Sequence, residues 1–312
     1  MAGQLALDLP GFGPEVPDLA SYHRIVANLS GGKDSIAMLV ELLAHAEAAG
    51  VTDRIVVVHA DLGDAEWEGT RDLAAEHAAA YGLRFEVVAR TGSGLIERIE
   101  ERGMFPDAEN RWCTSDFKRG PVRRLFTALV RELEAAGHTG QVRILNVMGL
   151  RADESPARRK LIAFTHDGAW TCPCRECRRR RAIAEPYKAK KLPVPKHART
   201  GHGASNSLRH VDTWLPVHSW STDDVWRTVR ESGLRVHDAY QAGMPRLSCV
   251  FCVLASRSAL VRAAQLQPKK AARYAAVEAK IGHRFRLDVS MAEIIAEAEA
   301  TPAVAAVACW EG

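Results

Sequence analysis

The sequence lacks long apolar runs, has few cysteines and carries no basic residue near its start. No stretch of about 18 apolar residues occurs, which excludes a transmembrane helix and predicts no membrane partner. Residues 1–20 contain no Lys or Arg but hold three prolines, so we expect a flexible tail rather than a signal peptide. Seven cysteines in 312 residues are too few for a disulfide scaffold. We therefore expect a cytoplasmic protein whose clustered cysteines serve metal or redox chemistry.

Positive charge is concentrated in one part of the chain. Residues 151–200 hold 14 Lys and Arg against five acids, a net charge of +9 in a chain whose total is +4. Such a patch attracts phosphate-rich partners, and this segment is predicted to contact nucleic acid. A solvated basic loop is the alternative interpretation.

The first half of the chain alternates short β-branched runs with longer helical patterns, which predicts an α/β fold with a doubly wound parallel sheet. The expected strands are 24–29, 54–60, 84–89 and 142–148. The expected helices are 34–49, 64–81, 94–102 and 115–136.

The second half is organised differently. Residues 152–213 are rich in Arg, Lys, Pro, Gly and His with little periodicity, which indicates a basic, cysteine-containing insertion. A helix is expected to start at Ser221, and the Ala-rich end predicts helices near 256–266, 268–281 and 290–300. We therefore divide the chain into a tail (1–20), a nucleotide-binding α/β domain (21–151), the insertion (152–213) and a helical C-terminal region (214–312).

A short glycine loop lies between the first predicted strand and the first predicted helix. Two glycines let the backbone approach an anion, and the amides of a helix start attract negative charge. The loop differs from GxxxxGK[ST], because one Gly-Gly turn is followed by Lys and Asp. The predicted nucleotide-binding residues of this loop are Ser30, Gly31, Gly32, Lys33, Asp34 and Ser35.

This hexapeptide, SGGKDS, resembles the pyrophosphate loop of the adenine-nucleotide α-hydrolase superfamily. Three further stretches resemble elements of the 3′-phosphoadenosine 5′-phosphosulfate (PAPS) reductase family within it: GLRADESPAR at 149–158, PVHSWSTDDVW at 216–226, and 233–252 with its CxxC. HADLG at 59–63 is similar to the family's element beside the nucleotide. The resemblance implies binding of ATP with Mg²⁺, or of PAPS, and chemistry at the α-phosphate.

The same resemblance implies roles for three further residues. Asp61 is expected near the adenine, and Arg151 and Arg158 are expected to stabilise phosphate charge together with Lys33. Asp34 is expected to belong to the same catalytic group. The residues themselves agree, because charged side chains just past a parallel strand face the ligand crevice, and an arginine fork suits phosphate. The alternatives are an ion pair with Glu154 for the arginines and a backbone cap for Asp61.

Three cysteines match a metal site of the family. Cys249 and Cys252 form a CxxC, a spacing that suits one metal centre or a redox pair. In the iron–sulfur branch of the family, a Cys-Cys pair joins this CxxC to hold a [4Fe–4S] cluster, and Cys113 falls on the first of that pair while Thr114 replaces the second. The resemblance therefore implies three cluster ligands, with zinc or dithiol chemistry as alternatives.

Three more cysteines, Cys172, Cys174 and Cys177, form CxCxxC in the basic insertion. They are expected to form a Zn²⁺ site with His166, to give the cluster a fourth ligand, or to remain free thiols. Cys309 stands alone in VACWEG, where PAPS reductases carry a nucleophilic cysteine in an ECGxH-like motif.

The departure at Cys309 favours ATP-dependent, pyrophosphate-releasing sulfur transfer, plausibly onto nucleic acid, over sulfonucleotide reduction. The features are most similar to those of sulfur transferases of DNA phosphorothioation, which implies a cysteine-desulfurase-type sulfur donor. A sulfite-releasing PAPS or adenylyl-sulfate reductase is the first alternative. A non-catalytic module that binds nucleotide and nucleic acid is the second.

Overall fold

A six-stranded, mostly parallel sheet forms the centre of the protein. The computed structural model describes residues 16–168, 175–198 and 203–302. The strand order is β3-β2-β1-β4-β6-β5, and only β5 at the edge runs antiparallel to its neighbour. The strands are β1 Arg24–Asn28, β2 Ile55–Asp61, β3 Arg84–Ala89, β4 Val142–Met148, β5 Phe164–His166 and β6 Arg209–Trp214.

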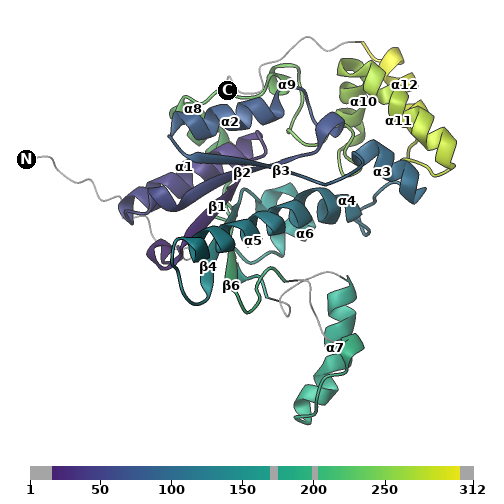
Figure 1. Ribbon diagram of the computed structural model, residues 1–312. Coiled ribbons are helices and arrows are strands. Elements are labelled where there is room, and N and C mark those ends of the chain that lie inside the picture. Colours follow the sequence, from purple (N-terminus) through teal and green to yellow (C-terminus); the bar gives the residue numbers. More distant parts are fainter. Residues whose placement is uncertain (1–15, 169–174, 199–202, 303–312) are drawn as a thin grey trace, which may run out of the picture.

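Helices cover both faces of the sheet, as a doubly wound fold requires (Figure 1). Three helices share a hydrophobic cluster on one face: α1 Lys33–Ala48, α2 Thr70–Ala80 and α8 Thr222–Ser232. On the other face, α5 Gly120–Ala135 packs through residues such as Leu129 against Val26 and Ile144. The doubly wound α/β fold expected from the sequence is thus confirmed.

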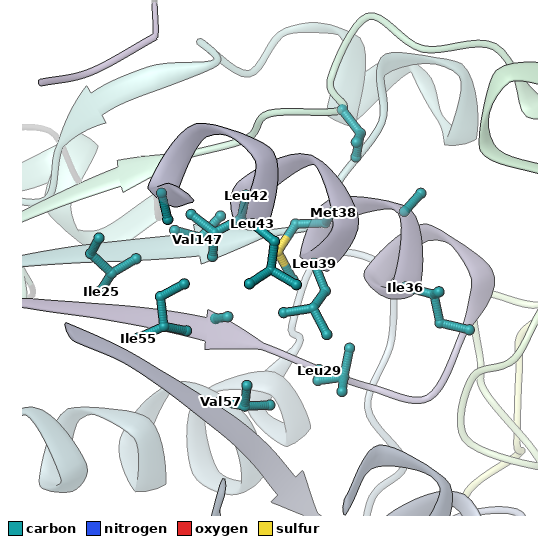
Figure 2. Packing of buried hydrophobic residues seen from close by; sticks show 14 of the residues in the cluster. Ile25, Leu29, Ile36, Met38, Leu39, Leu42, Leu43, Ile55, Val57 and Val147 are labelled. Carbon is teal, nitrogen blue, oxygen red and sulfur yellow. The ribbon is translucent and has the colours of Figure 1, made fainter. Parts of the chain in front are cut away.

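Helix α1 is held by an apolar face that meets the sheet. Its residues Ile36, Leu39 and Leu43 belong to the same buried cluster as Ile25 of β1 and Ile55 of β2 (Figure 2). Full burial of one such side chain contributes about 1.5–3 kcal/mol, so this contact fixes the helix on the strands. The loop before α1 is positioned accordingly.

The C-terminal region forms a separate hydrophobic cluster beside the sheet. It contains α10 Arg257–Leu266, α11 Pro268–Ile281 and α12 Met291–Ala300. The same cluster includes residues of the short helical segment that begins at residue 112. These three helices lie within one residue of their predicted bounds. The shorter helices are α3 Leu95–Arg102, α4 Trp112–Thr114, α6 Pro156–Arg159 and α9 Asp238–Gln241. A π-helical turn, Ser115–Arg119, joins α4 to α5.

The segment between 152 and 213 is more ordered than its composition indicates. It contains β5, helix α7 Arg175–Ala189 and the parallel strand β6, and α7 extends away from the sheet (Figure 1). The pattern of β6 is hidden because four of its six residues are polar. Asp212 binds Tyr22, and Thr213 accepts a hydrogen bond from Asn146, so the strand buries these polar groups with partners. None of the described helices is long and apolar enough to cross a membrane.

The direction in which strands are added reverses between β1 and β4, and this reversal positions the candidate site. In open α/β sheets the ligand crevice lies at the carboxyl ends of strands at such a switch point. The loop after β1 leads into α1, and the loop after β4 begins at Gly149. A Cβ atom at Gly149 would collide with the backbone of Asp34 in the first turn of α1, so this close approach requires glycine.

We expect Gly149→Ala to lower the free energy of unfolding by about 1–3 kcal/mol, because the added methyl group must displace the first turn of α1. Urea denaturation measures this loss. Gly82→Ala is the control, since Gly82 has a φ of 63° with open space around it and tests backbone strain without a collision. Equal losses in the two variants would contradict the close approach.

Candidate nucleotide and thiol site

The glycine loop forms a tight turn at the start of α1. Gly31 has a φ of 72°, and Gly32 caps the helix without a side-chain hydrogen bond. Ser35 holds the turn together, since its hydroxyl donates to the Gly32 carbonyl (2.8 Å) and accepts from the Ser30 amide (3.2 Å). Ser30 is exposed, whereas both glycines are buried with Leu247 packed near them. The loop therefore presents its Ser30 side to solvent.

Lys33 is a buried cation at the first position of α1. Its side chain is 6% exposed, and its ammonium lies 3.2 Å from Asp34 and 5.9 Å from the ring centres of Trp226 and Tyr240. Burial lowers the pKa of Lys33, although the charge of Asp34 opposes this shift. The hydroxyl of Tyr240 accepts a hydrogen bond from the Lys33 amide (3.0 Å) and fixes the start of the helix.

Asp34 and Arg151 form a buried ion pair that joins α1 to the loop after β4. The Nε of Arg151 donates to Asp34 at 2.5 Å, and the rest of the guanidinium donates to the Trp220 carbonyl (3.1 Å) and the Thr222 hydroxyl (3.2 Å). Burial alone would raise the pKa of Asp34, but the Lys33 and Arg151 charges hold it below its usual value. The Arg151 fork is thus directed at protein acceptors, so its geometry is that of a residue that positions the loop.

Further arginines surround this pair. Arg158 forms an ion pair with Glu154. The carboxylate of Glu154 also forms an ion pair with Arg246, whose guanidinium nitrogen lies 3.0 Å from it. Burial and the nearby charge of Arg246 lower the pKa of Arg158 to about 10. The charge of Arg246 also lowers the pKa of Lys33. Four cations from three segments of the chain thus lie beside the glycine loop, an arrangement that suits phosphate binding.

Asp61 lies at the carboxyl end of β2, where sequence analysis expects the adenine. Its carboxylate accepts a hydrogen bond from the Gly63 amide (2.7 Å), as in the backbone-cap alternative, and lies 3.8 Å from Arg71. It also lines an open pocket of about 260 Å³ whose other walls include Ala89, Gly94 and Phe117. The Asp61 side chain can accept from the backbone and line the pocket at the same time, because 25% of it is exposed.

The three cysteines expected to hold a cluster come together. Cys113 lies in α4, and Cys249 and Cys252 lie in the loop before α10. Burial raises the pKa of the Cys249 thiol to about 12; the neighbouring charge of Lys118 opposes this shift, and the other two thiols add to it. Burial and Cys252 likewise raise the pKa of Cys113. Thiols so close together are ionised at low cost only beside a cation, which is what a metal centre supplies.

Two observations bear on the kind of group these thiols fit. The three sulfur atoms do not all lie within 4.8 Å of one another, among the residues that the structure describes. Sulfur ligands of one tetrahedral zinc lie roughly 3.8 Å apart, given Zn–S bonds of about 2.3 Å. In addition, the hydroxyl of Tyr274 is buried without a hydrogen-bond partner; burial raises its pKa, and the three thiols add to this shift. The separation of the thiols therefore does not match a single zinc ion in this arrangement, and Tyr274 offers a buried, unpaired donor near them.

The other predicted cysteines cannot be related to this site. Cys172, Cys174 and Cys309 lie outside the described residues, and so does the side chain of Cys177 in α7. Their expected roles stay predictions.

Sequence reasoning missed several residues that complete the site. The sequence indicates Glu154 only as a partner for the arginines of its own segment. In the structure its carboxylate forms ion pairs with both Arg158 and Arg246. Leu247, which packs against both the sheet cluster and the C-terminal cluster, had no signal in the sequence. Tyr274 lies within an Ala-rich helix whose pattern reads as ordinary core. Arg246 and Tyr240 were visible only as part of the family-like stretch 233–252.

We expect Asp34→Asn to lower the free energy of unfolding by about 3–5 kcal/mol, because it leaves the buried Arg151 guanidinium without its nearest anionic partner and with only the exposed Asp153, 3.8 Å away. Chemical denaturation at neutral pH measures this loss. The control is Glu76→Gln, which breaks an exposed pair with Arg235 and should cost less than about 1 kcal/mol. Similar losses in the two variants would contradict a special role for the buried pair.

The same pair predicts a pH dependence. Because the folded state holds the pKa of Asp34 below its usual value, the pair stabilises the fold fully above the unfolded-state pKa of about 3.9 and loses this contribution as the pH falls through the lower folded value. The difference in unfolding free energy between wild type and Asp34→Asn should therefore shrink below about pH 4. A constant difference from pH 6 to pH 3 would contradict the assignment.

Comparisons with known proteins find one curated relative, several distantly similar structures and one family model. An uncharacterised 37.8 kDa protein of Escherichia phage 186 is 22% identical over 192 residues, which are 61% of this chain and 44% of the phage protein. The chain thus spans less than half the length of that relative.

Solved structures with a distant likeness include three enzymes. The PAPS reductase of Candida auris in a phosphate complex is 13% identical, with a TM-score of 0.41 over 74% of this chain and 83% of that one. The U34-tRNA thiolase NcsA of Methanococcus maripaludis, with its [4Fe–4S] cluster, is 15% identical (TM-score 0.35; 91% and 74%). The FMN adenylyltransferase of Candida glabrata, with FAD and inorganic pyrophosphate, is 13% identical (TM-score 0.40; 73% and 55%).

The family model of the phosphoadenosine phosphosulfate reductase domain matches residues 24–255, the stretch that holds the glycine loop, the arginine cluster and all three of the grouped cysteines. The family predicted from the motifs is confirmed, and the chain belongs to the phosphoadenosine phosphosulfate reductase family.

Proposed function

We propose that this protein is an ATP-dependent sulfur transferase that activates an acceptor by adenylylation and carries an iron–sulfur cluster. The acceptor oxygen attacks the α-phosphate of ATP and pyrophosphate leaves. Hydrosulfide then attacks the activated acceptor atom, and AMP leaves with the former acceptor oxygen. This reaction needs an anion site for the nucleotide and a thiolate site for the cluster side by side.

One observation carries the proposal: a single short segment contributes to both sites. Arg246 joins the arginine cluster, and Leu247 packs against the glycine loop while its amide donates to the Tyr240 hydroxyl (3.3 Å). Cys249 and Cys252 follow within five residues. A nucleotide held by the loop would therefore lie close to the thiol group.

The chain's own residues have separable tasks in this reaction. Lys33 and Arg158 stabilise the charge that develops on the α-phosphate and on the leaving pyrophosphate. Asp34 and Arg151 keep the loop in place, and Asp61 borders the pocket for the base. Mg²⁺ accompanies ATP and shares its phosphate charge.

Cys113, Cys249 and Cys252 would hold a [4Fe–4S] cluster, with the Tyr274 hydroxyl as a hydrogen-bond donor to sulfur. When bound, such a cluster supplies a thiophilic iron that binds the sulfur to be transferred. The spread of the three thiols favours this group over a single Zn²⁺ at these residues.

Nucleic acid is the acceptor that the charge distribution favours. Helix α7 carries five arginines, of which Arg178 and Arg179 are exposed, and it extends away from the sheet (Figure 1). A protruding basic helix suits phosphate backbone contacts, whose strength falls steeply with salt.

A sulfonucleotide reductase is the second candidate, because the matching family model is named for that activity. It predicts release of sulfite from PAPS or adenylyl sulfate that depends on Cys309. Sulfite release that Cys309→Ser abolishes would favour the reductase over the transferase.

We expect Lys33→Met to reduce pyrophosphate release from ATP by about 10²–10³-fold, because it removes the charge at the loop and keeps the apolar stem. Protein purified without oxygen is assayed with the acceptor nucleic acid and a sulfide source. Lys280→Met, on the exposed side of α11, is the control. Unchanged turnover in Lys33→Met would contradict the assignment of the loop.

We expect anaerobically purified protein to be brown with about four irons per chain, and Cys113→Ser to lose most of this iron because one of three thiolate ligands is removed. Iron analysis and visible absorbance measure the loss, and Cys309→Ser serves as the control that keeps its iron. A colourless wild-type protein that contains zinc at these cysteines would contradict the cluster.

A further inference from the structure

A second group of ligand-type side chains lies away from the nucleotide and thiol sites. His166, His210 and Asp212 each offer one ligand atom, and these three atoms all lie within 4.8 Å of one another. The Nδ1 of His166 lies 2.9 Å and the Nε2 of His210 lies 3.0 Å from the Asp212 carboxylate. The proposed function uses none of these residues.

The sheet itself brings these residues together. His166 is the cross-strand partner of Asp212 in the antiparallel pair β5–β6, so the two side chains share a face. His210 precedes Asp212 by two residues on β6 and lies on that same face. Strand register thus fixes the group without help from a loop, and this preorganisation is what a metal site needs.

The details of the group match a zinc-type site. The two imidazole rings are stacked with centres 4.3 Å apart, and both direct a nitrogen at one carboxylate. Ligand atoms of a tetrahedral Zn²⁺ lie roughly 3.3 Å apart, given bonds of about 2.0–2.1 Å, so the ion could replace the present hydrogen bonds with little movement. Tyr22 donates to the second oxygen of Asp212 at 2.7 Å, as outer partners of metal-binding carboxylates do.

The group is reachable from solvent. Asp212 is buried, but the His166 and His210 side chains are 41% and 36% exposed. Tyr22 also borders an open pocket of about 320 Å³, together with Arg143 and Phe164. Arg143 lies 3.9 Å from Asp212 and opposes the binding of a cation, although its own side chain is 42% exposed and screened by water.

We propose that His166, His210 and Asp212 form a binding site for a divalent ion of the zinc class, independent of the cluster cysteines. The ion would link the three-residue edge strand β5 to β6, directly before the segment that leads to α7. Its role is structural: it fixes the base of the arginine-rich segment to the sheet.

The test measures binding of Zn²⁺ and Co²⁺ to full-length, anaerobically purified protein with its iron in place. We expect one ion per chain beyond the iron, a rise in melting temperature on adding Zn²⁺, and at least tenfold weaker binding in His210→Ala and His166→Ala. Tyr22→Phe should weaken binding by about tenfold, because only the outer hydrogen bond is lost. Iron content should stay unchanged in all three variants, which separates this site from the cluster.

The control is a matched histidine pair. The rings of His23 and His138 have centres 4.3 Å apart. Within the described residues neither ring has a carboxylate partner, so His138→Ala should bind Zn²⁺ as wild type does. His210→Gln repeats the test if the alanine variant is poorly folded. The proposal is overturned if wild type binds no extra ion, or if the double variant His166→Ala/His210→Ala keeps it. The proposal is also overturned if wild type binds a single extra Co²⁺ and that ion shows a thiolate-to-cobalt absorption band, which would place it on cysteines.

Discussion

The buried ion pair between Asp34 and Arg151 is the constraint on which the rest of the site depends. It joins the first turn of α1 to the loop after β4, and through the Trp220 carbonyl and Thr222 it also holds the start of α8. Three chain segments that meet at the switch point of the sheet therefore share one guanidinium. Such a group is costly to bury, and its full set of acceptors is what makes its burial tolerable.

The arginines outside this pair are arranged differently. Arg158 and Arg246 share the single carboxylate of Glu154, whereas Arg151 has acceptors on every side. A guanidinium that shares its acceptor has donors left for another anion. The arrangement thus separates one arginine that maintains the fold from two that are suited to a ligand with phosphate groups.

Much of the sheet follows from local patterns, and much of the site does not. Strands such as β2 and β4 are rich in β-branched and other apolar residues and are mostly buried, so the local pattern identifies them. Local patterns do not predict strand β6, because Asp212 and Thr213 carry polar groups. Their partners, Tyr22 and Asn146, are far away in the sequence. Glu154 illustrates the same limit of local patterns. Its position in the sequence indicates an ion pair with a nearby arginine, but its ion pair with Arg246 depends on a loop that is distant in the sequence. Only the resemblance to the family implied that Cys113 belongs with the CxxC, because the long separation along the chain is bridged only by tertiary packing.

Leu247 contacts the sheet cluster and the C-terminal cluster alike, and it lies two residues before Cys249. A backbone shift in the glycine loop therefore reaches the thiols through one side chain. Thermodynamic linkage makes such coupling mutual, so whatever occupies the thiols must alter the affinity for nucleotide by the same factor as nucleotide alters theirs. A chain with empty thiols and a chain with occupied thiols would then differ in their affinity for an anion at the glycine loop.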